Sequence, residues 1–414
     1  MLATLALVLS LHAAAQPSEV LREMRIQGNI LTADEEVIRL SGVAIGSLVT
    51  PDTPAEVAAR LRQTKRFEQV DVLKRFASIE DPSQIALVII LDEGPVSIEP
   101  QRDGPPRIVR KRGLSLQFLP VLDFEDGYGF SYGVRSALPA PLGAGSRLSF
   151  PVTWGGTKQV GAELDLDRPR GPLAVLSRFQ VGGSLLRREH PFYREEDDRA
   201  RAWVRAERVL APGLRAGGLA RLQHVSFADR RDRFTELGAD IVFDTRIDPA
   251  LPRNAVYSRA AWSRLDFARA DAAHRTELEA RGYVGLLGQT VLAVGVQRKD
   301  SSRSLPPYLQ PILGGMSSLR GFAAGSAMGD TLAAGSLELL VPLTSPLSFG
   351  KLGVSAFVDA GAVYDKGQRL ADQRFRRGAG GAVWFSAAFV RAYLAVAHGI
   401  GGSTRTHFGT TLAF

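Results

Sequence analysis

Hydrophobic and polar residues alternate along most of the chain. From residue 113 to residue 414, stretches of about ten residues place apolar side chains at every second position, and Gly, Pro, Asn or Asp separate the stretches. The segment Val354–Tyr364, for example, alternates Val and Ala with Ser355, Phe357 and Asp359. A period of two indicates β-strands whose two faces lie in different surroundings. We count about sixteen such stretches and therefore predict about sixteen strands.

The polar face of these strands carries many charges. Glu163, Asp165 and Asp167 alternate with apolar residues in one stretch, as do Glu277 and Glu279 in another. A soluble antiparallel sheet also alternates in this way and is an alternative interpretation. A lipid-facing side of Ala, Val and Leu opposite a hydrated interior favours a transmembrane antiparallel β-barrel, because lipid cannot satisfy a free strand edge. We expect the acidic rows to face a solvated lumen rather than to bind Ca²⁺ or to act as acid–base pairs.

Residues 20–95 follow a different pattern, which predicts a small α+β domain. Residues 85–91 are almost continuously apolar, as in a central strand that helices cover. The proline- and charge-rich residues 96–112 are predicted to link this domain to the barrel. The other expected elements are a strand that ends at Gly28-Asn29, a helix with a capping box of Thr32 and Glu35, a helix that begins at Thr53-Pro54, and a strand from Phe67 to Phe76.

Residues 1–15 are predicted to form a signal peptide. The apolar run from Leu2 to Leu11 precedes Ala13 and Ala15, which have the small side chains that a signal peptidase requires. The usual basic residues before the run are missing, and a buried helix is the alternative. No later segment has the about 20 consecutive apolar residues that a membrane-spanning helix needs. We therefore expect an exported protein that does not cross a membrane with helices.

Composition argues against an enzyme. The 414 residues include no Cys, which excludes disulfides, thiolate metal sites and Cys nucleophiles. Nucleophile-elbow, zinc-protease and phosphate-loop motifs are missing, and the six His have no ligand spacing, so we expect no catalytic residue, metal site or cofactor. The net charge of +8 and the basic runs 110–112 and 230–233 could suggest nucleic acid. Export and barrel patterning favour lipid headgroups or solvation instead, and we expect no nucleic-acid partner.

One long connection, from about residue 300 to residue 329, interrupts the short turns. It contains the motif GG-x-x-S-x-RGF, formed by Gly314, Gly315, Arg320, Gly321 and Phe322. With this motif the chain resembles the BamA- and TamA-like outer-membrane assembly superfamily. Further parts of the chain that resemble this family are the N-terminal domain, residues 244–249, residues 357–361 and the terminal Phe414.

The resemblance implies a protein of the bacterial outer membrane that inserts or translocates other proteins. The N-terminal domain would be a periplasmic POTRA module, and the strand with Phe67, Val70 and Val72 would accept an extended client by β-augmentation. The first and last barrel strands would form a seam. Outer-membrane lipids and unfolded client proteins are the implied partners. The resemblance leaves open whether periplasmic or lipoprotein accessory subunits also bind. The alternatives are a two-partner-type secretion pore for a dedicated passenger and a passive outer-membrane channel.

Arg320 is the residue on which this function would depend. Glycines around it permit a close backbone approach, so the loop can fold into a wide barrel. A guanidinium there can bind a carboxylate with two hydrogen bonds. Asp359 lies on the lumen face by the alternation, and the resemblance implies that it is the partner; Glu338 is a second candidate. The alternative is a solvated Arg320. We expect Phe322 to pack against the inner wall.

The last strand is predicted to close the barrel. Phe408, Leu412 and Phe414 fall on one of its faces, and the sequence given ends on the aromatic residue. A terminal Phe can simply be the end of an ordinary closing strand. In an exported barrel it also resembles the signal that barrel-assembly machinery recognises.

Overall fold

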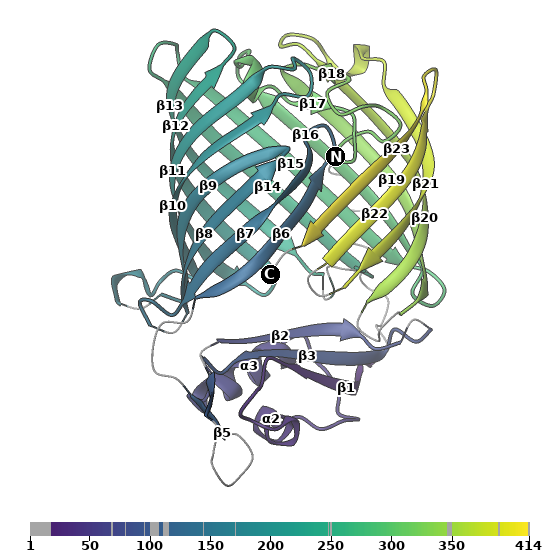
Figure 1. The fold of residues 1–414 in the computed structure, drawn as a ribbon. Helices are drawn as coiled ribbons and strands as arrows, with labels where there is room; N and C mark the ends of the chain where they lie inside the picture. Colours follow the sequence, from purple (N-terminus) through teal and green to yellow (C-terminus); the bar gives the residue numbers. More distant parts are fainter. Residues whose placement is uncertain are drawn as a thin grey trace. The chain divides into compact units, whose positions relative to one another are not determined.

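The computed structural model describes the chain between residues 18 and 412, except positions 68, 79, 95, 100–106, 111–115, 144, 170, 247, 249–250, 346–349 and 388–389. The expected signal peptide and Phe414 therefore lie outside the described residues. The chain divides into two compact units, one built mainly from residues up to Gln117 and the other mainly from Phe118 onward. Each unit is described separately below (Figure 1).

The first unit is a small α+β fold. Its sheet has the order β1-β3-β2, so β3 is central, parallel to β1 and antiparallel to β2. Helices α2 and α3 contribute Val37, Val57 and Leu61 to a core that also contains Ile85 and Leu87 of β3. Each such buried side chain contributes about 1.5–3 kcal/mol to stability. The elements are β1 (Val20–Gln27), α2 (Asp34–Ser41), α3 (Thr53–Gln63), β2 (Gln69–Phe76) and β3 (Gln84–Asp92).

The start of α2 differs from the expected capping box. Ala33 is the N-cap residue and makes no side-chain cap hydrogen bond. Thr32 instead donates its hydroxyl and its backbone N–H to the carboxylate of Glu93. The backbone N–H groups of Ile30 and Leu31 donate to the same carboxylate, which is 3% exposed. The prediction was wrong because a distant acid satisfies the donors that the local Glu35 was expected to cover.

The segment predicted as a linker contains some regular structure. Strands β4 (Val96–Glu99) and β5 (Arg107–Arg110) pair antiparallel as a two-stranded ribbon. The backbone pairing corrects the expectation that residues 96–112 would be only a connection.

The second unit is a closed antiparallel barrel of sixteen strands, which confirms the predicted mainly β barrel and its strand number (Figure 1). Because the strand number is even, β6 begins and β23 ends at the same rim. The strands are β6 (Gln117–Glu125), β7 (Gly129–Pro139), β8 (Ser146–Gly155), β9 (Thr157–Asp167), β10 (Arg178–Glu189), β11 (Glu196–Ala211), β12 (Leu214–Phe227), β13 (Arg230–Asp244), β14 (Ala255–Phe267), β15 (Ala273–Gly285), β16 (Val291–Ser301), β19 (Thr331–Thr344), β20 (Lys351–Tyr364), β21 (Arg376–Ser386), β22 (Val390–Gly399) and β23 (Thr404–Leu412).

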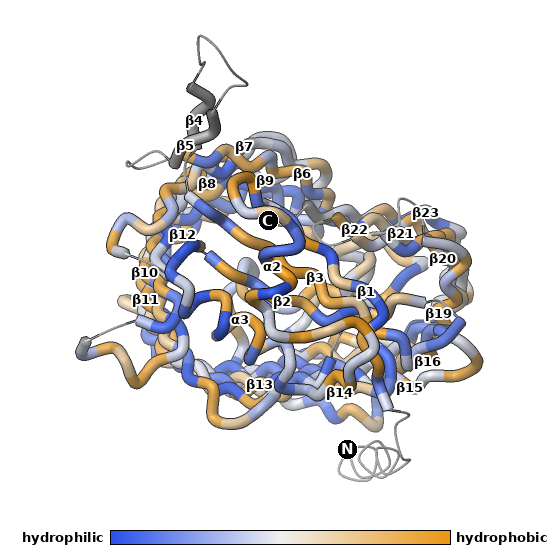
Figure 2. Tube along the Cα trace, turned by 90° about the horizontal axis from the view of Figure 1, so that it is seen from below, coloured by the Kyte–Doolittle hydropathy of each residue, from blue (hydrophilic) through white to orange (hydrophobic). Residues whose placement is uncertain are grey.

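The wall of the barrel has the expected two faces. Figure 2 shows hydrophobic and hydrophilic residues interspersed around the barrel. Val358 of β20 is 51% exposed on the outside, whereas its neighbours Phe357 and Asp359 are 4% and 5% exposed on the inside. Val160 of β9 and Leu185 of β10 are also exposed outward. The period-two pattern therefore identified the outward apolar face and the inward polar face correctly. In the described part of the chain, no helix is long and apolar enough to cross a membrane.

A long connection between β16 and β19, residues 302–330, leaves the rim opposite the start of β6. We call this segment the lid loop. It contains a 3₁₀ turn (Pro307–Leu309) and two short paired strands, β17 (Ile312–Leu313) and β18 (Ala327–Met328). Leu313 and Leu319 of the lid loop pack against Leu332 and Ala334 of β19, so the loop is seated on the inner wall.

Candidate functional site

Three glycines allow the lid loop to reach the wall. Gly314, Gly315 and Gly321 have φ values of 109°, 73° and 90°, which residues with a Cβ rarely adopt. A Cβ on Gly314 would lie 1.9 Å from the carbonyl oxygen of Ala323. A Cβ on Gly321 would lie 2.7 Å from the backbone nitrogen of Gly399 in β22. Glycine is therefore required for both the turn and the close approach.

This approach places Arg320 inside the barrel, where the residue is 6% exposed. Its Nε and Nη2 atoms each donate a 2.7 Å hydrogen bond to a different carboxylate oxygen of Asp359. Its Nη1 atom donates to Glu338 at 2.8 Å and to the Tyr393 hydroxyl at 2.7 Å. Its Nη2 atom also donates to Ser336 at 2.9 Å. All five N–H donors of the guanidinium are thus used.

The acceptors of Arg320 are themselves held in place. Ser336 donates to Asp359 at 2.7 Å, and Ser355 and Tyr393 donate to Glu338 at 2.6 and 2.7 Å. The guanidinium carbon lies 3.4 Å from the centre of the Phe357 ring, a cation–π contact. A buried cation with two carboxylates is stable only when this kind of network satisfies the remaining atoms. The arrangement can hold the loop tip, and it offers no free acid or base for catalysis.

The sequence pattern contained a signal for part of this network. Ser336 and Glu338 share one face of β19, and Ser355 and Asp359 share one face of β20. The register then pairs Ser336 with Asp359. The sequence predicts only the two carboxylates as partners, and Tyr393, which comes from β22, carries no local signal.

His407 is a second anchor of the loop tip that the sequence analysis missed. The backbone N–H of Gly321 donates to His407 Nε2 at 2.9 Å, so the ring proton belongs on Nδ1. His407 Nδ1 lies 2.6 Å from Asp126 Oδ2. His407 belongs to β23, and Asp126 follows β6. The loop tip is therefore tied to both strands that close the barrel.

Phe322, the last residue of the motif, packs with Leu313 and Leu319. Its ring lies beside β22, because a Cβ on Gly399 would come within 2.9 Å of it. The guanidinium carbon of Arg376 lies 5.8 Å from the ring centre. This placement is on the inner wall.

Strands β6 and β23 are the two strands that close the barrel. Among the described residues they pair at Thr410↔Phe124 and Thr411↔Asp123. Strands β22 and β23, in contrast, pair from Val390↔Leu412 to His398↔Thr404. Phe408 packs edge-on against Phe124, with the ring centroids 5.3 Å apart. The side chain of Leu412 and the whole of Phe414 are not among the described parts of the chain.

The expected client strand, β2, lies at an edge of its sheet. Its neighbouring residue Phe67 and its own Val70 are 7% and 1% exposed, and Val72 packs partly buried against the same core. These side chains hold the strand in place. The outer edge of β2 therefore presents backbone groups, and its Val70 carbonyl accepts a hydrogen bond from Arg62 at 2.6 Å.

The lumen contains many ion pairs. Arg205 donates to Asp240 at 2.8 Å, Arg275 donates to Glu236 at 2.6 Å, and Arg259 donates to Glu277 of the predicted acidic rows at 3.2 Å. Over the residues that the structure describes, no group of acidic and His side chains is arranged to hold a metal ion. The acidic rows thus supply partners for lumen arginines.

Comparisons with known proteins bear on this architecture. Residues 131–407 match the Omp85 superfamily domain. A BamA chain from Haemophilus ducreyi that lacks POTRA domains 1–3 has the same fold, with a TM-score of 0.62 and 16% identity over 96% of this chain and 85% of that chain. CdiB from Acinetobacter baumannii has a TM-score of 0.52 and 15% identity, covering 96% and 74%. CdiB from Escherichia coli has a TM-score of 0.53 and 12% identity, covering 97% and 92%. A comparison with curated proteins found no match.

Proposed function

Because this chain belongs to the Omp85 superfamily, a family of barrels of the bacterial outer membrane, we propose that it inserts or translocates other proteins there. The observation that carries this proposal is a lid loop tied to both closing strands, which among the described residues pair at two positions.

The first unit is proposed to be a POTRA domain in the periplasm. Its order of strand, two helices and two strands, with β3 between β1 and β2, supports this assignment. The outer backbone edge of β2 could pair with an extended client once Arg62 and Arg75 release the carbonyl groups of Val70 and Lys74. Hydrogen bonds to the main chain would make this pairing largely independent of the client sequence. The expected signal peptide would deliver the protein to this compartment.

The seam is proposed to be the exit toward the bilayer. Strands β6 and β23 could separate at low cost, because their described register spans Phe124 and Thr410 with one further pair. A client strand could then take up the exposed edges. Gly321 contacts His407, and His407 contacts Asp126, so the lid loop would hold both edges together until a client arrives.

A secretion pore for a dedicated passenger is the second candidate. Ion pairs such as Arg205–Asp240 line part of the lumen, and the folded lid loop is seated on its wall. An extended passenger could therefore pass if the lid loop withdrew. This function needs a moving lid loop but does not need an open seam.

A crosslink across the seam tests the two candidates. The chain has no Cys, so the pair Phe124→Cys and Thr410→Cys adds the only thiols and should form a disulfide between paired residues. Liposomes that contain this variant should stop inserting an unfolded client barrel and should recover when a reductant is added. The control pair Val396→Cys and Thr406→Cys links β22 to β23 away from the Phe124–Phe408 contact and should leave insertion intact. Full activity of the oxidised seam variant would refute insertion through the seam and would favour passage through the lumen.

A further inference from the structure

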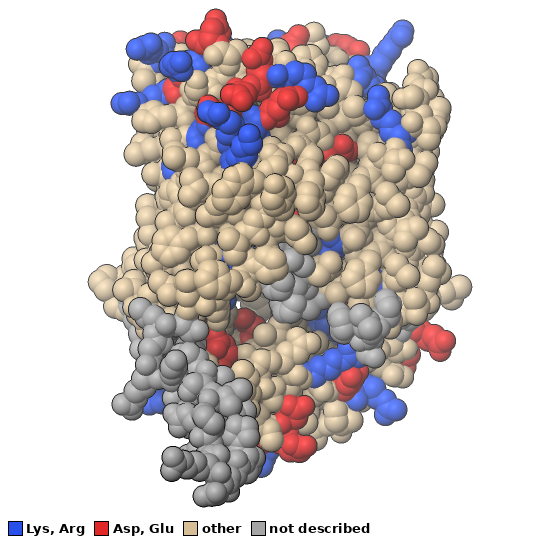
Figure 3. Space-filling view, in the orientation of Figure 1, with Lys and Arg blue, Asp and Glu red and all other residues tan. Residues whose placement is uncertain are grey.

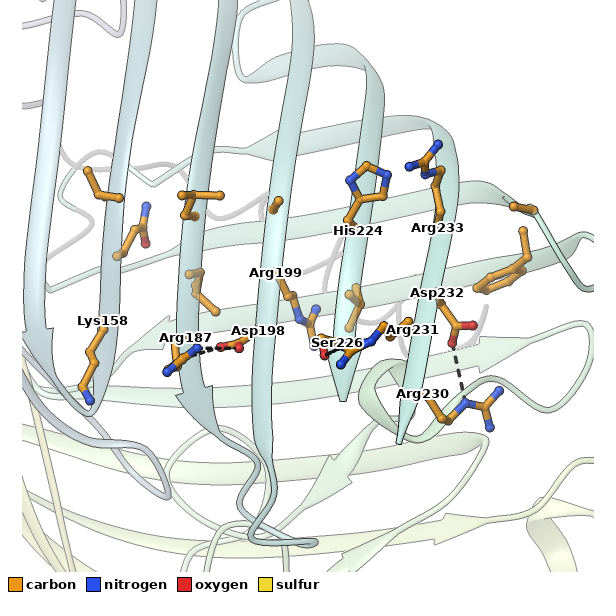
Figure 4. Close-up of a pocket in the computed structure, with 18 of the residues that line it drawn as sticks. Lys158, Arg187, Asp198, Arg199, His224, Ser226, Arg230, Arg231, Asp232 and Arg233 are labelled. Atoms are coloured by element: carbon orange, nitrogen blue, oxygen red, sulfur yellow. Dashed lines mark hydrogen bonds and ion pairs between the residues drawn. The ribbon is translucent and has the colours of Figure 1, made fainter. Parts of the chain in front are cut away.

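Near the rim that bears the lid loop, the outer wall of β9–β13 carries charged side chains (Figures 3 and 4). In Figure 3 charged groups gather at this rim above a wide belt of other side chains. One row runs straight across five strands, because each member is the register partner of the next. We call it the rim row: Lys158, Arg187, Asp198, Ser226 and Arg231.

The next outward-facing row lies nearer the middle of the wall. It is apolar on β9, β10 and β11 and polar on β12 and β13. It pairs Val160 with Leu185, Leu185 with Ala200, Ala200 with His224 and His224 with Arg233. One step further, Ala202 is paired with Leu222, which is 61% exposed. The wall therefore offers cations and hydrophobic side chains within two residues of each other.

The two rows line a groove. A cavity of about 1170 Å³ includes all five members of the rim row. A second cavity of about 830 Å³ shares Val160, Leu185, Ala200 and His224 with the first and continues past Ala202 and Leu222. Small side chains on β11, between larger ones on β10 and β12, give the groove its depth. Its end at the rim is basic, and its end toward the middle of the wall is apolar.

The cations of the groove are only partly neutralised. Arg187 binds Asp198 through two hydrogen bonds of 2.6 and 2.8 Å. Arg231 donates to the hydroxyl of Ser226 at 2.9 Å, which leaves its positive charge unbalanced. Lys158 and Arg233 have no acidic partner among the residues that the structure describes. Trp154, which is 53% exposed, lines the same groove at the level where aromatic residues mark a membrane interface.

We propose that this groove binds a phosphorylated glycolipid of the outer leaflet. Phosphate oxygens would accept hydrogen bonds from Arg231, Arg233 and Lys158, and the acyl chains would lie along Val160, Leu185 and Leu222. This inference rests on the proposed function in one respect, namely that the rim with the lid loop faces the cell exterior. A free phosphate would bind only at the basic end near the rim, and it would leave the apolar end of the groove without a ligand.

The test measures equilibrium binding of lipid A, a glycolipid with two phosphates, to the full-length protein in detergent, with dephosphorylated lipid A as the comparison. The variant Arg231→Ala/Arg233→Ala should bind lipid A about tenfold or more weakly, because it loses charge-assisted hydrogen bonds to phosphate. The control variant Arg369→Ala/Arg374→Ala removes the same charge from an exposed loop between β20 and β21 at the same rim and should bind normally. Heat-modifiable gel mobility shows that each variant is a folded barrel.

Three results would overturn the proposal: equal affinity for the two forms of the lipid, equal weakening by both variants, or displacement of lipid A by inorganic phosphate at similar concentration. The last would make the groove a free-phosphate site. Client insertion by wild-type protein into liposomes without lipid A is scored separately. A protein that binds lipid A through the groove but inserts no client refutes the proposed function alone, and one that inserts clients but binds no lipid A refutes the groove alone.

Discussion

Arg320 and the outward arginines of β13 differ in how completely the protein satisfies them. Arg320 uses all five of its N–H donors on four side chains and is 6% exposed. Arg231 has a hydroxyl as its hydrogen-bond partner, and both Arg231 and Arg233 are exposed on the outer wall. A cation whose donors are all taken fastens one part of the protein to another. A cation with free donors beside an apolar groove is suited to a ligand that brings its own acceptors.

The largest effect is expected for the variant Arg320→Ala, because all N–H donors of this guanidinium have partners. Arg320→Ala leaves the carboxylates of Asp359 and Glu338 buried without their cation, a change that typically costs about 3–5 kcal/mol. Because the lid loop can detach while the sheet stays closed, we expect client assembly to fall more than tenfold and the barrel to keep its heat-modifiable mobility. Limited proteolysis should then cut the lid loop.

The matched control for this variant is Arg233→Ala, which removes an arginine from the opposite face of the wall. It should leave the lid loop protected from protease. Full assembly activity of Arg320→Ala would show that the fastening has no functional role.

In the first unit, Glu93 is a buried anion whose carboxylate is satisfied by hydrogen bonds, as the cation of Arg320 is in the barrel. Burial opposes ionisation of Glu93, but hydrogen bonds from Leu31, Thr32 and Ile30 outweigh it and lower the pKa of the carboxyl group. A lowered pKa in the folded state stabilises the unit above the unfolded pKa of about 4.3, and this stabilisation is lost as the pH falls through the folded value.

Glu93→Gln should therefore destabilise the unit near neutral pH by about 1–3 kcal/mol and flatten its stability profile below pH of about 4.3. Protease resistance of the first unit, followed in the full-length chain across this pH range, measures both effects. The surface variant Glu80→Gln, also in the first unit, is the control, since Glu80 is exposed. Identical pH profiles for wild type and Glu93→Gln would contradict the assignment.

A smaller effect is expected at His407, because it makes one hydrogen bond to the loop tip. His407→Ala removes the acceptor of the Gly321 N–H and leaves Asp126 without its ring partner, at a cost of about 1–2 kcal/mol. We expect the lid loop to become more sensitive to protease while Arg320 still holds it. The outward-facing His224→Ala should have no such effect, and equal protection of both variants would exclude His407 as an anchor.

More of the fold than of the candidate site could be predicted from the sequence. Alternation placed Asp359 and Glu338 inside the barrel and Val358 outside, because a strand has only two faces. The same rule separates Arg231 and Arg233 from Asp232, whose carboxylate accepts a hydrogen bond from Tyr308 of the lid loop at 2.6 Å. A period of two does not reveal which strands become neighbours. Tyr393 and His407 therefore stayed hidden until the register was known.

The expected capping box failed for a related reason. The spacing of Thr32 and Glu35 describes a local hydrogen-bond exchange, but Glu93, about sixty residues away, took the donors instead. Local patterns compete with partners that the fold brings close, and only the three-dimensional structure decides between them. Lys74 also has a partner that no local pattern indicates, because its buried side chain pairs with the distant Glu19.

The smallest effect should come from Arg187, whose pairing with Asp198 resembles that of Arg320 with Asp359. Both arginines make two hydrogen bonds to one carboxylate, but the Arg187 side chain is 52% exposed and the Arg320 side chain is 7% exposed. Exposed ion pairs contribute little, because water replaces either partner. Arg187→Ala should therefore leave the melting temperature of the barrel unchanged within error, as measured by differential scanning calorimetry. A fall as large as that from Arg320→Ala would mean that pairing geometry, rather than burial, decides what an arginine contributes to this barrel.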